Sequence, residues 1–382
     1  MTTRPLRVAL VVGTLGQGGA EKQCVFLLDA LQHHGAEIRL FVLSRGGFYE
    51  PAVRAMGVEP IWIGRWSLPP LRLLGLARRL RSFRPDIVQA WHFYANLYAV
   101  MGARLASALD IGSIRNDVYK ELGDTGRWGR RLLRAPSGII ANSHAARNNA
   151  AKQGIDPARI QVLPNVIDLE DFDRRSEKAS DLPQLVGRPA AVAVANARPA
   201  KRLDRFLLAL QIARQKVHNM TGVIIGDGPD RTALEHQASE LGLTPGGAIF
   251  LGRRDDVPAL LRSFDMLVLS SQHEGFPNVL LEAMAAGLPV VTTPAGDAAR
   301  IVEDRESGFV VDFDDVQAMA DRIVKLATSA DLRRRFGQAG RNRVERVYSH
   351  LGLPRRVVDA YRSIASLAGR HELDEALRQI RD

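Results

Sequence analysis

The stretch 271–293 constrains the fold more than any other part of the chain. It reads Ser-Gln-His-Glu-Gly-Phe-Pro-Asn-Val-Leu-Leu-Glu-Ala-Met-Ala-Ala-Gly-Leu-Pro-Val-Val-Thr-Thr. Pro277 suits a first helical position and Gly287 suits the residue just past a helix end, so we predict a helix over 277–286. A buried strand over 289–293 follows directly. A helix that is almost wholly apolar beside a buried strand indicates an α/β layer.

Two acidic residues accompany this predicted helix. Glu282 lies in its middle, where an unpaired carboxylate is costly to bury, so we expect it to have a partner. Glu274 lies in the turn before the helix, where free backbone N–H groups and the helix dipole favour an anion. The layout fits a phosphorylated ligand with sugar hydroxyls on Glu274 and ribose hydroxyls on Glu282. Alternatively, Glu274 only caps the helix and Glu282 pairs with a buried Arg.

The segment Glu-Gly-Phe-Pro-Asn-Val-Leu-Leu-Glu, followed by Ala-Met-Ala-Ala-Gly-Leu-Pro-Val-Val, closely resembles the paired-Glu signature (E-x7-E) of family 4 retaining glycosyltransferases. The resemblance implies an α/β GT-B fold, in which two Rossmann-like parallel domains face a central cleft. It also implies a nucleotide-sugar donor. Five residues between the two acids are then expected to bind this donor: Gly275, Phe276, Pro277, Asn278 and Val279.

Length and composition agree with a two-domain enzyme. At 382 residues the chain is too long for one ordinary domain. No apolar run approaches the roughly 20 residues that a membrane span needs, and no signal sequence is evident at the N-terminus. The single cysteine, Cys24, excludes an internal disulfide. We therefore expect a cytoplasmic protein, which could associate peripherally with the inner face of the membrane.

The domain boundaries follow from the pattern of strands and helices. Residues 1–170 are predicted to form an N-terminal Rossmann-like domain that binds the acceptor, and 171–354 a C-terminal Rossmann-like domain that binds the nucleotide sugar. The segment Pro-Asn-Val-Ile-Asp at 164–168 resembles the one that closes the first domain in the family. As in GT-B proteins, the terminal helix, within 355–382, is expected to cross back to the first domain.

Candidate site residues of the first domain follow two predicted strands. The strand 6–12 leads into a glycine-rich turn and a helix, and the turn lacks the dinucleotide-binding G-x-G-x-x-G spacing. The resemblance assigns Gly18 and Gly19 to a loop for the donor phosphate or the acceptor. His92 follows the strand 86–90 at the end where α/β domains bind ligands. We expect it to contact the transferred sugar or the acceptor, unless its role is structural.

Cations follow the first strand of the second domain, where an anion would bind. Arg198 can make a bidentate phosphate contact and Lys201 supplies a point charge. The resemblance implies that they hold the donor diphosphate, with Arg202 as an alternative to Lys201. It also places Gly226 close to the ligand and the nucleobase near Arg253.

The excess positive charge lies in the first half of the chain. Residues 1–165 carry 22 Lys and Arg against 11 Asp and Glu. A basic amphipathic helix after Pro69-Pro70, the stretch 127–134 and tryptophans such as Trp66 suit an anionic membrane surface. The alternative is that these arginines simply face water. A phosphorylated acceptor would also fit, whereas no nucleic-acid partner is expected.

The predicted activity is transfer of a hexosyl unit to a glycan or lipid-linked acceptor, in cell-envelope polysaccharide or lipopolysaccharide synthesis. Cations and a helix N-terminus can stabilise the leaving diphosphate, so we expect metal-independent catalysis and no cofactor. The resemblance implies retention of the anomeric configuration, and because no nucleophile for a two-step route is evident, we expect front-face attack by the acceptor. Two D-x-D matches, at 171–173 and 312–314, lie at predicted linker or cap positions and are not assigned to a metal. The alternatives are a GT-B nucleotide-sugar epimerase and a non-catalytic basic adaptor for membrane or nucleic acid.

Overall fold

The computed structural model describes residues 4–33, 35–64, 68–178 and 189–378. The chain divides into two compact units. Unit 1 comprises Met1–Val166 and His350–Asp382, and unit 2 comprises Ile167–Ser349. The sequence placed these transitions after residues 170 and 354. Each unit is an α/β domain with its own parallel sheet, and together they have the predicted fold class of two Rossmann-like domains.

The described strands of unit 1 form one parallel sheet in the order β3-β2-β1-β4-β5-β6-β7. Their bounds are β1 Arg7–Val12, β2 Glu37–Val42, β3 Ile61–Trp62, β4 Ile87–Ala90, β5 Leu109–Ile114, β6 Gly138–Ala141 and β7 Ile160–Val162. The order reverses at β1, which pairs with β2 on one side and with β4 on the other. Ligands of α/β sheets bind at the carboxyl ends of the strands at such a switch point.

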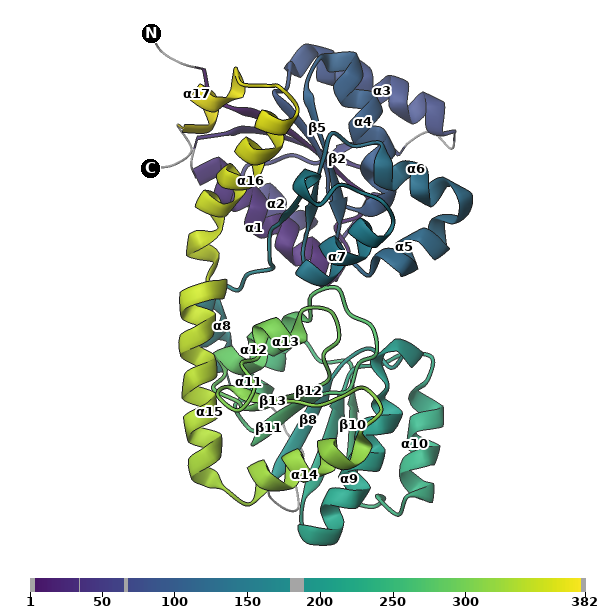
Figure 1. Ribbon diagram of the computed structural model, residues 1–382, viewed down its shortest axis with the longest axis vertical. Coiled ribbons are helices and arrows are strands. Elements are labelled where there is room, and N and C mark those ends of the chain that lie inside the picture. Colours follow the sequence, from purple (N-terminus) through teal and green to yellow (C-terminus); the bar gives the residue numbers. More distant parts are fainter. Residues whose placement is uncertain (1–3, 34, 65–67, 179–188, 379–382) are drawn as a thin grey trace. The chain divides into compact units, whose positions relative to one another are not determined.

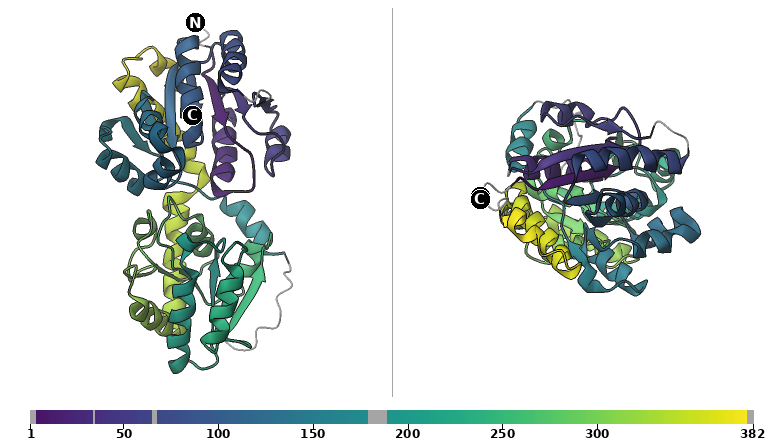
Figure 2. Two further views of the ribbon diagram at one scale, coloured as in Figure 1. Left: turned by 90° about the vertical axis from the view of Figure 1, so that its right-hand side faces the viewer. Right: turned by 90° about the horizontal axis from the view of Figure 1, so that it is seen from above.

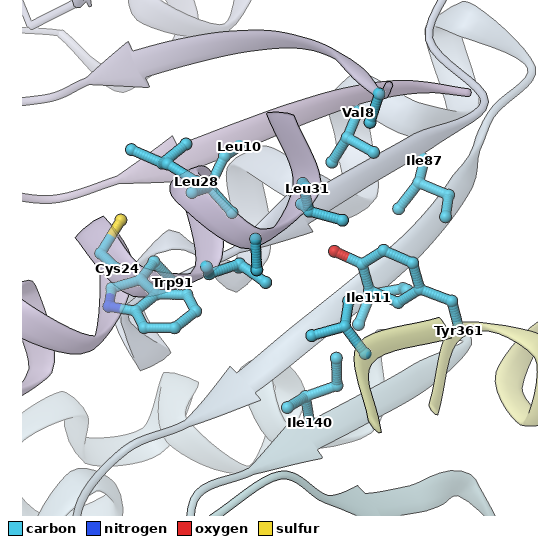
Figure 3. Close-up of a cluster of buried hydrophobic side chains, with 14 of the residues drawn as sticks. Val8, Leu10, Cys24, Leu28, Leu31, Ile87, Trp91, Ile111, Ile140 and Tyr361 are labelled. Atoms are coloured by element: carbon cyan, nitrogen blue, oxygen red, sulfur yellow. The ribbon is translucent and has the colours of Figure 1, made fainter. Parts of the chain in front are cut away.

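Helices cover both faces of this sheet (Figures 1 and 2). They are α1 Gly19–His33, α2 Glu50–Ala55, α3 Pro69–Phe83, α4 Asn96–Ala106, α5 Val118–Thr125, α6 Gly129–Arg134, α7 His144–Lys152, α16 Leu353–Leu367 and α17 Leu373–Arg378. One buried cluster joins α1 and α16 to the sheet, and another joins α3 and α4. Figure 3 shows the first of these, in which Leu28 and Leu31 of α1 and Tyr361 of α16 gather over β1 and β4. The buried Tyr361 hydroxyl also donates a hydrogen bond to Gln89 Oε1.

Unit 2 repeats the architecture with strand order β10-β9-β8-β11-β12-β13, all parallel. The strands are β8 Ala190–Val194, β9 Thr221–Ile225, β10 Ala248–Gly252, β11 Met266–Leu269, β12 Val290–Thr292 and β13 Gly308–Val310. The helices are α8 Leu169–Ser176, α9 Leu203–Lys216, α10 Arg231–Glu240, α11 Val257–Leu261, α12 Asn278–Ala285, α13 Ala298–Ile301, α14 Val316–Ala327 and α15 Ala330–Arg343, the last continued by a π-helical turn at Val344–Tyr348. The switch point of this sheet lies between β8 and β11.

The structure corrects two local predictions. Pro277 is the N-cap of α12, with ψ of 93°, and not its first helical residue. Trp91 is buried in the core of unit 1, where its indole Nε1 donates to Ala20 O, so it belongs to no basic surface. Trp66 lies outside the described residues, and Trp128 is exposed. The polar run 171–181, expected to be a linker or an exposed helix, begins within helix α8, and its last residues lie outside the described part.

Candidate active site

The central strands of unit 2 bring two predicted site residues together. β8 and β11 are adjacent and parallel, so the segments that follow them leave the same edge of the sheet. After β8 the chain forms a short 3-10 turn, Pro199–Lys201, and after β11 it runs through residues 270–277 into α12. Lys201 ends the first segment and Glu274 lies in the second, so the switch point supplies one cation and one anion.

Lys201 and Glu274 form a close ion pair. The Lys201 Nζ donates to both carboxylate oxygens of Glu274, at 2.7 and 2.9 Å. The Ser271 hydroxyl donates to Glu274 Oε1 at 2.7 Å, so the carboxylate is held from two sides. The side chains of Lys201 and Glu274 are 27% and 11% exposed. Charge-assisted bonds of this kind, partly shielded from water, fix the orientation of the carboxylate.

Hydrogen bonds to the backbone hold these two segments against each other. The backbone N–H of Gln272 donates to Ala200 O at 2.8 Å, and the Ser270 hydroxyl donates to Lys201 O at 3.1 Å. The buried Arg205 donates to Gln272 Oε1 at 2.9 Å from the first turns of α9. The Lys201–Glu274 pair therefore rests on a backbone that is fixed at several points.

Arg198 and Arg202, the other cations of this turn, differ in their pairing. The guanidinium of Arg202 is bonded to Asp204, with Nε–Oδ1 at 3.0 Å, and so is already neutralised. Arg198 is exposed, and its guanidinium makes no hydrogen bond or ion pair with any described residue. It borders a cavity of about 290 Å³ between α9 and α10, which does not include Glu274. Arg198 is thus the cation that is free to take an anionic ligand.

The residues Gly275–Pro277 directly precede α12, and Asn278 and Val279 are its first two residues. Gly275, Phe276 and Pro277 are buried, and the Phe276 ring packs edge-on against Tyr348 at 5.8 Å. The Phe276 side chain is therefore part of the core, and only its backbone is available to a ligand. Asn278 and Val279 are half-buried at the first turn of the helix.

Glu282 lies on α12 and is half-buried, whereas the sequence predicted a buried carboxylate. It has an interaction partner in the structure, as expected for an acid on an apolar helix. Gly287 lies just beyond the helix, as predicted, and its φ of +75° is in the left-handed region that favours glycine.

Gly226 and Arg253 follow the neighbouring strands β9 and β10. The Gly226 N–H donates to Gly252 O at 2.8 Å. A Cβ at Gly226 would lie 2.0 Å from Ala195 O, and its φ is +135°, so only glycine fits where these strands end. Arg253 is exposed directly after β10. Both residues therefore lie on the same carboxyl edge as Lys201 and Glu274.

In unit 1 the register of β1 with β4 pairs Val11 with Ala90 and brings Gly13 next to His92. The Gly13 N–H donates to His92 Nδ1 at 3.1 Å, so the ring proton lies on Nε2, which is 3.4 Å from Glu21 Oε1. Both ring nitrogens of His92 thus have partners. A Cβ at Gly18 would lie 2.3 Å from Glu21 Oε2, so Gly18 leaves room for this carboxylate.

Gly13, Gly18, Glu21 and His92 form what we call the His92 cluster. Tyr94 also belongs to it, although the sequence did not point to Tyr94. Its ring stacks on His92 at 5.4 Å, and its hydroxyl occupies the space where a Cβ of Gly13 would lie. Burial, together with the charges of Glu21 and Glu121, raises the pKa of Tyr94, so its phenol stays protonated and can donate a hydrogen bond. Gly19 is exposed at the first position of α1, beside this cluster.

Comparison with known proteins shows the family of this chain. The family described as "Glycosyltransferase Family 4" matches residues 17–171, and "Glycosyl transferases group 1" matches residues 175–343. Together the two matches cover both units. The chain belongs to glycosyltransferase family 4.

Two lipopolysaccharide core biosynthesis glycosyltransferases of Rhizobium meliloti (strain 1021) are similar to this family 4 enzyme over most of its length. LpsE is 28% identical over 332 residues, which are 85% of this chain and 89% of LpsE. LpsD is 25% identical over 371 residues, which are 90% of this chain and 94% of LpsD. The enzyme is thus a glycosyltransferase, and the epimerase and adaptor alternatives are not supported.

Solved structures agree on the fold of this glycosyltransferase. The crystal structure of Anabaena Alr3699/HepE in complex with UDP superposes with a TM-score of 0.81 at 19% identity, covering 94% of this chain and 100% of that one. The complex of the same protein with UDP-glucose gives a TM-score of 0.79. WaaG, from lipopolysaccharide biosynthesis, gives 0.66 at 18% identity. The fold is therefore GT-B.

Proposed function

We propose that this enzyme transfers a hexosyl unit from a nucleotide-diphosphate sugar to a glycan or lipid-linked acceptor during lipopolysaccharide or other cell-envelope polysaccharide synthesis. The observation that carries the proposal is the Lys201–Glu274 pair at the switch point of unit 2, with the unpaired Arg198 on the same turn. LpsE and LpsD are named for lipopolysaccharide core biosynthesis, and HepE binds UDP and UDP-glucose. These relatives support the class of donor and product.

In this proposal the residues of unit 2 act on the donor. Arg198 and Lys201 hold the diphosphate and stabilise the charge that develops as it leaves. Glu274 accepts hydrogen bonds from hydroxyls of the transferred sugar, and Glu282 holds the ribose. Arg253 and the backbone at Gly226 lie at the end of the site that takes the nucleobase.

We infer that the reaction retains the anomeric configuration. The acceptor oxygen attacks the anomeric carbon from the face that the diphosphate leaves, so one C–O bond forms while the other breaks. The acceptor proton passes to the departing phosphate oxygen. No enzyme nucleophile is required by this route, which agrees with the role of Glu274 as a hydrogen-bond acceptor.

Catalysis is proposed to be independent of metal, because the unpaired Arg198, with Lys201 on the same turn, lies where a metal ion would otherwise neutralise the diphosphate. Among the D-x-D candidates, Asp173 pairs with Arg341 and Arg262, and Asp314 pairs with Arg205. In the described part of the chain no group of three or more His, Cys, Asp or Glu is placed to hold a metal ion.

We further propose a cytoplasmic location at the inner face of the membrane. No helix among the described residues is long and apolar enough to cross a membrane. Helix α3 of unit 1 has no acidic residue, exposes Leu71 and Leu74, and continues with the exposed Arg78 and Arg81 on the same helical face. Exposed leucines suit the apolar part of a lipid surface, and the arginines beside them suit anionic lipid headgroups.

The experiment that tests the function screens UDP-, GDP- and ADP-sugars for thermal stabilisation and hydrolysis. A donor at 100 times its Kd is expected to raise the melting temperature by roughly 5 °C or more. Turnover should survive EDTA, and NMR of the product should show the anomeric configuration of the donor. If no nucleotide sugar stabilises the protein or is hydrolysed, the proposal fails. Loss of turnover in EDTA contradicts metal independence alone, and an inverted product contradicts retention alone.

Ser271 is expected to position Glu274 for the sugar. Because Ser271→Ala removes one charge-assisted hydrogen bond from the carboxylate, we expect kcat/KM for transfer to fall about tenfold. Ser271→Thr keeps a hydroxyl and should recover part of the activity. The kinetics of both variants, measured with saturating acceptor, provide the check. Equal activity of Ser271→Ala and the wild type would rule out this positioning role.

A further inference from the structure

Arg115 places an unpaired cation at the carboxyl end of the sheet in unit 1. It follows β5 directly, and its guanidinium stacks on the Trp91 ring, 3.6 Å from the ring centroid. Its Nε donates to the Ser113 hydroxyl at 3.1 Å. Its Nη2 is buried and has no hydrogen-bond partner, and no acidic residue in the described part of the chain forms an ion pair with it.

The surroundings of Arg115 do not compensate for its charge. Burial lowers the pKa of Arg115 to about 9, so the guanidinium is still protonated at neutral pH. The nearby groups are Cys24 and Tyr361, and burial raises the pKa of each above its usual range. Both are therefore neutral at pH 7 and cannot act as counter-ions. Charges withdrawn from water in folded proteins are normally paired, which makes Arg115, half-buried with its Nη2 covered, a candidate for an external anion.

The next strand offers a second unsatisfied group. Asn142 follows β6, the neighbour of β5, and its Nδ2 donates to Arg115 O at 2.9 Å. Its Oδ1 is buried without a partner and can accept a hydrogen bond. Arg115 and Asn142 thus follow adjacent strands of the sheet, one with an unpaired guanidinium donor and the other with an unpaired amide acceptor. Together they suit a ligand that carries both an oxyanion and a hydroxyl group.

Arg115 lies at the same edge of the sheet of unit 1 as the His92 cluster. β5 pairs with β4, which is followed by Trp91 and His92. Arg115 and the His92 cluster therefore leave the same edge of one sheet, from adjacent strands. A guanidinium can bind a phosphate or a carboxylate through two parallel hydrogen bonds, and the stacked Trp91 ring fixes its plane for such a contact.

We propose that Arg115 binds an oxyanion of the acceptor, and that the acceptor is a phosphate- or carboxylate-bearing glycan. This inference rests on the proposed glycosyl transfer and narrows its acceptor class. Arg115 recognises the anionic group, and Asn142 accepts a hydrogen bond from a hydroxyl on the same ligand.

The proposal is tested by direct binding of sugars to the full chain without nucleotide. Calorimetric or NMR titrations compare glucose 6-phosphate, glucuronate and uncharged glucose. We expect at least one anionic sugar to bind ten times or more tightly than glucose. The phosphate and carboxylate arms show which oxyanion the site takes. Equal affinity for all three sugars, or no binding of either anion, overturns the proposal.

Variants then assign the binding to the guanidinium. Arg115→Met keeps an apolar side chain on Trp91 and should reduce anion affinity roughly tenfold to a hundredfold, to the level of glucose. Arg115→Lys keeps the charge without the planar fork and should bind with intermediate affinity. The matched control is Arg39→Met, since Arg39 stacks on Phe83 in the same unit at 4.6 Å. Undiminished anion binding by both Arg115 variants overturns the proposal.

Two further measurements cover a misfolded Arg115→Met variant and separate the acceptor proposal from the proposed function. If Arg115→Met fails to fold, the Arg115→Lys titration alone decides, because a residue that only packs on Trp91 would not change anion affinity in a folded Lys variant. Donor hydrolysis by the wild type is measured separately. A protein that binds anionic sugars through Arg115 but hydrolyses no nucleotide sugar refutes the proposed function, whereas donor hydrolysis without anion selectivity refutes only the acceptor class.

Discussion

Replacing Glu274 with Gln is expected to lower kcat/KM for sugar transfer roughly 100-fold or more. The variant keeps the shape of the side chain and removes its negative charge. Glu274 then loses its charge-assisted bonds to Lys201 and Ser271, and it becomes a weaker acceptor for the sugar hydroxyls. Because the interactions with the sugar strengthen as positive charge develops at the anomeric carbon, the loss should appear mainly in kcat.

The measurement is steady-state transfer with the donor identified by the nucleotide-sugar screen. Glu240→Gln is the matched control, because Glu240 is an exposed acid of unit 2 that pairs only loosely with His236, at 3.4 Å. Its activity should equal that of the wild type. If Glu274→Gln retains wild-type kcat while its melting temperature falls, Glu274 serves stability alone and the assignment to the sugar is wrong.

The sequence predicted the fold well where local signals coincide. The strand Val290–Thr292 and the helix before Gly287 follow from short apolar runs and from the residues that terminate them. Pro277 is an N-cap because its backbone is extended. Proline is compatible with the N-cap and with the first helical position, so the sequence did not distinguish the two. The burial of Trp91 could not be read from the chain, since a residue at a strand end faces either a helix or solvent according to tertiary packing.

The sequence named candidate site residues but could not give their contacts. Glu274 and Lys201 are 73 residues apart, and only the pairing of β8 with β11 brings them together. The choice between Lys201 and Arg202 was open in the sequence, and the structure shows Arg202 paired with the nearby Asp204. Arg115 was missed because an Arg after a strand is ordinary until the structure shows its Nη2 buried without a hydrogen-bond partner. An unpaired buried group is a property of three-dimensional packing.

Replacing Lys201 with Met is expected to lower kcat roughly 100- to 1,000-fold, as for the loss of one group that stabilises a developing negative charge. The variant should also be less stable, by about 1–3 kcal/mol, because the Glu274 carboxylate, only 11% exposed, is left without its cation. Kinetics and chemical unfolding of the same preparation measure both effects. Lys216→Met is the control, since Lys216 is 60% exposed and pairs with Asp321 at 3.2 Å.

The two roles of Lys201 separate in the double variant Lys201→Met/Glu274→Gln. Removing both charges leaves no unpaired carboxylate, so most of the lost stability should return. Activity should stay low, because the cation at the diphosphate and the acceptor at the sugar are both absent. Recovery of activity along with stability would mean that Lys201 serves only to neutralise Glu274, and the leaving group would then depend on Arg198 alone. A double variant that is stable but clearly less active than Glu274→Gln alone assigns Lys201 to the diphosphate.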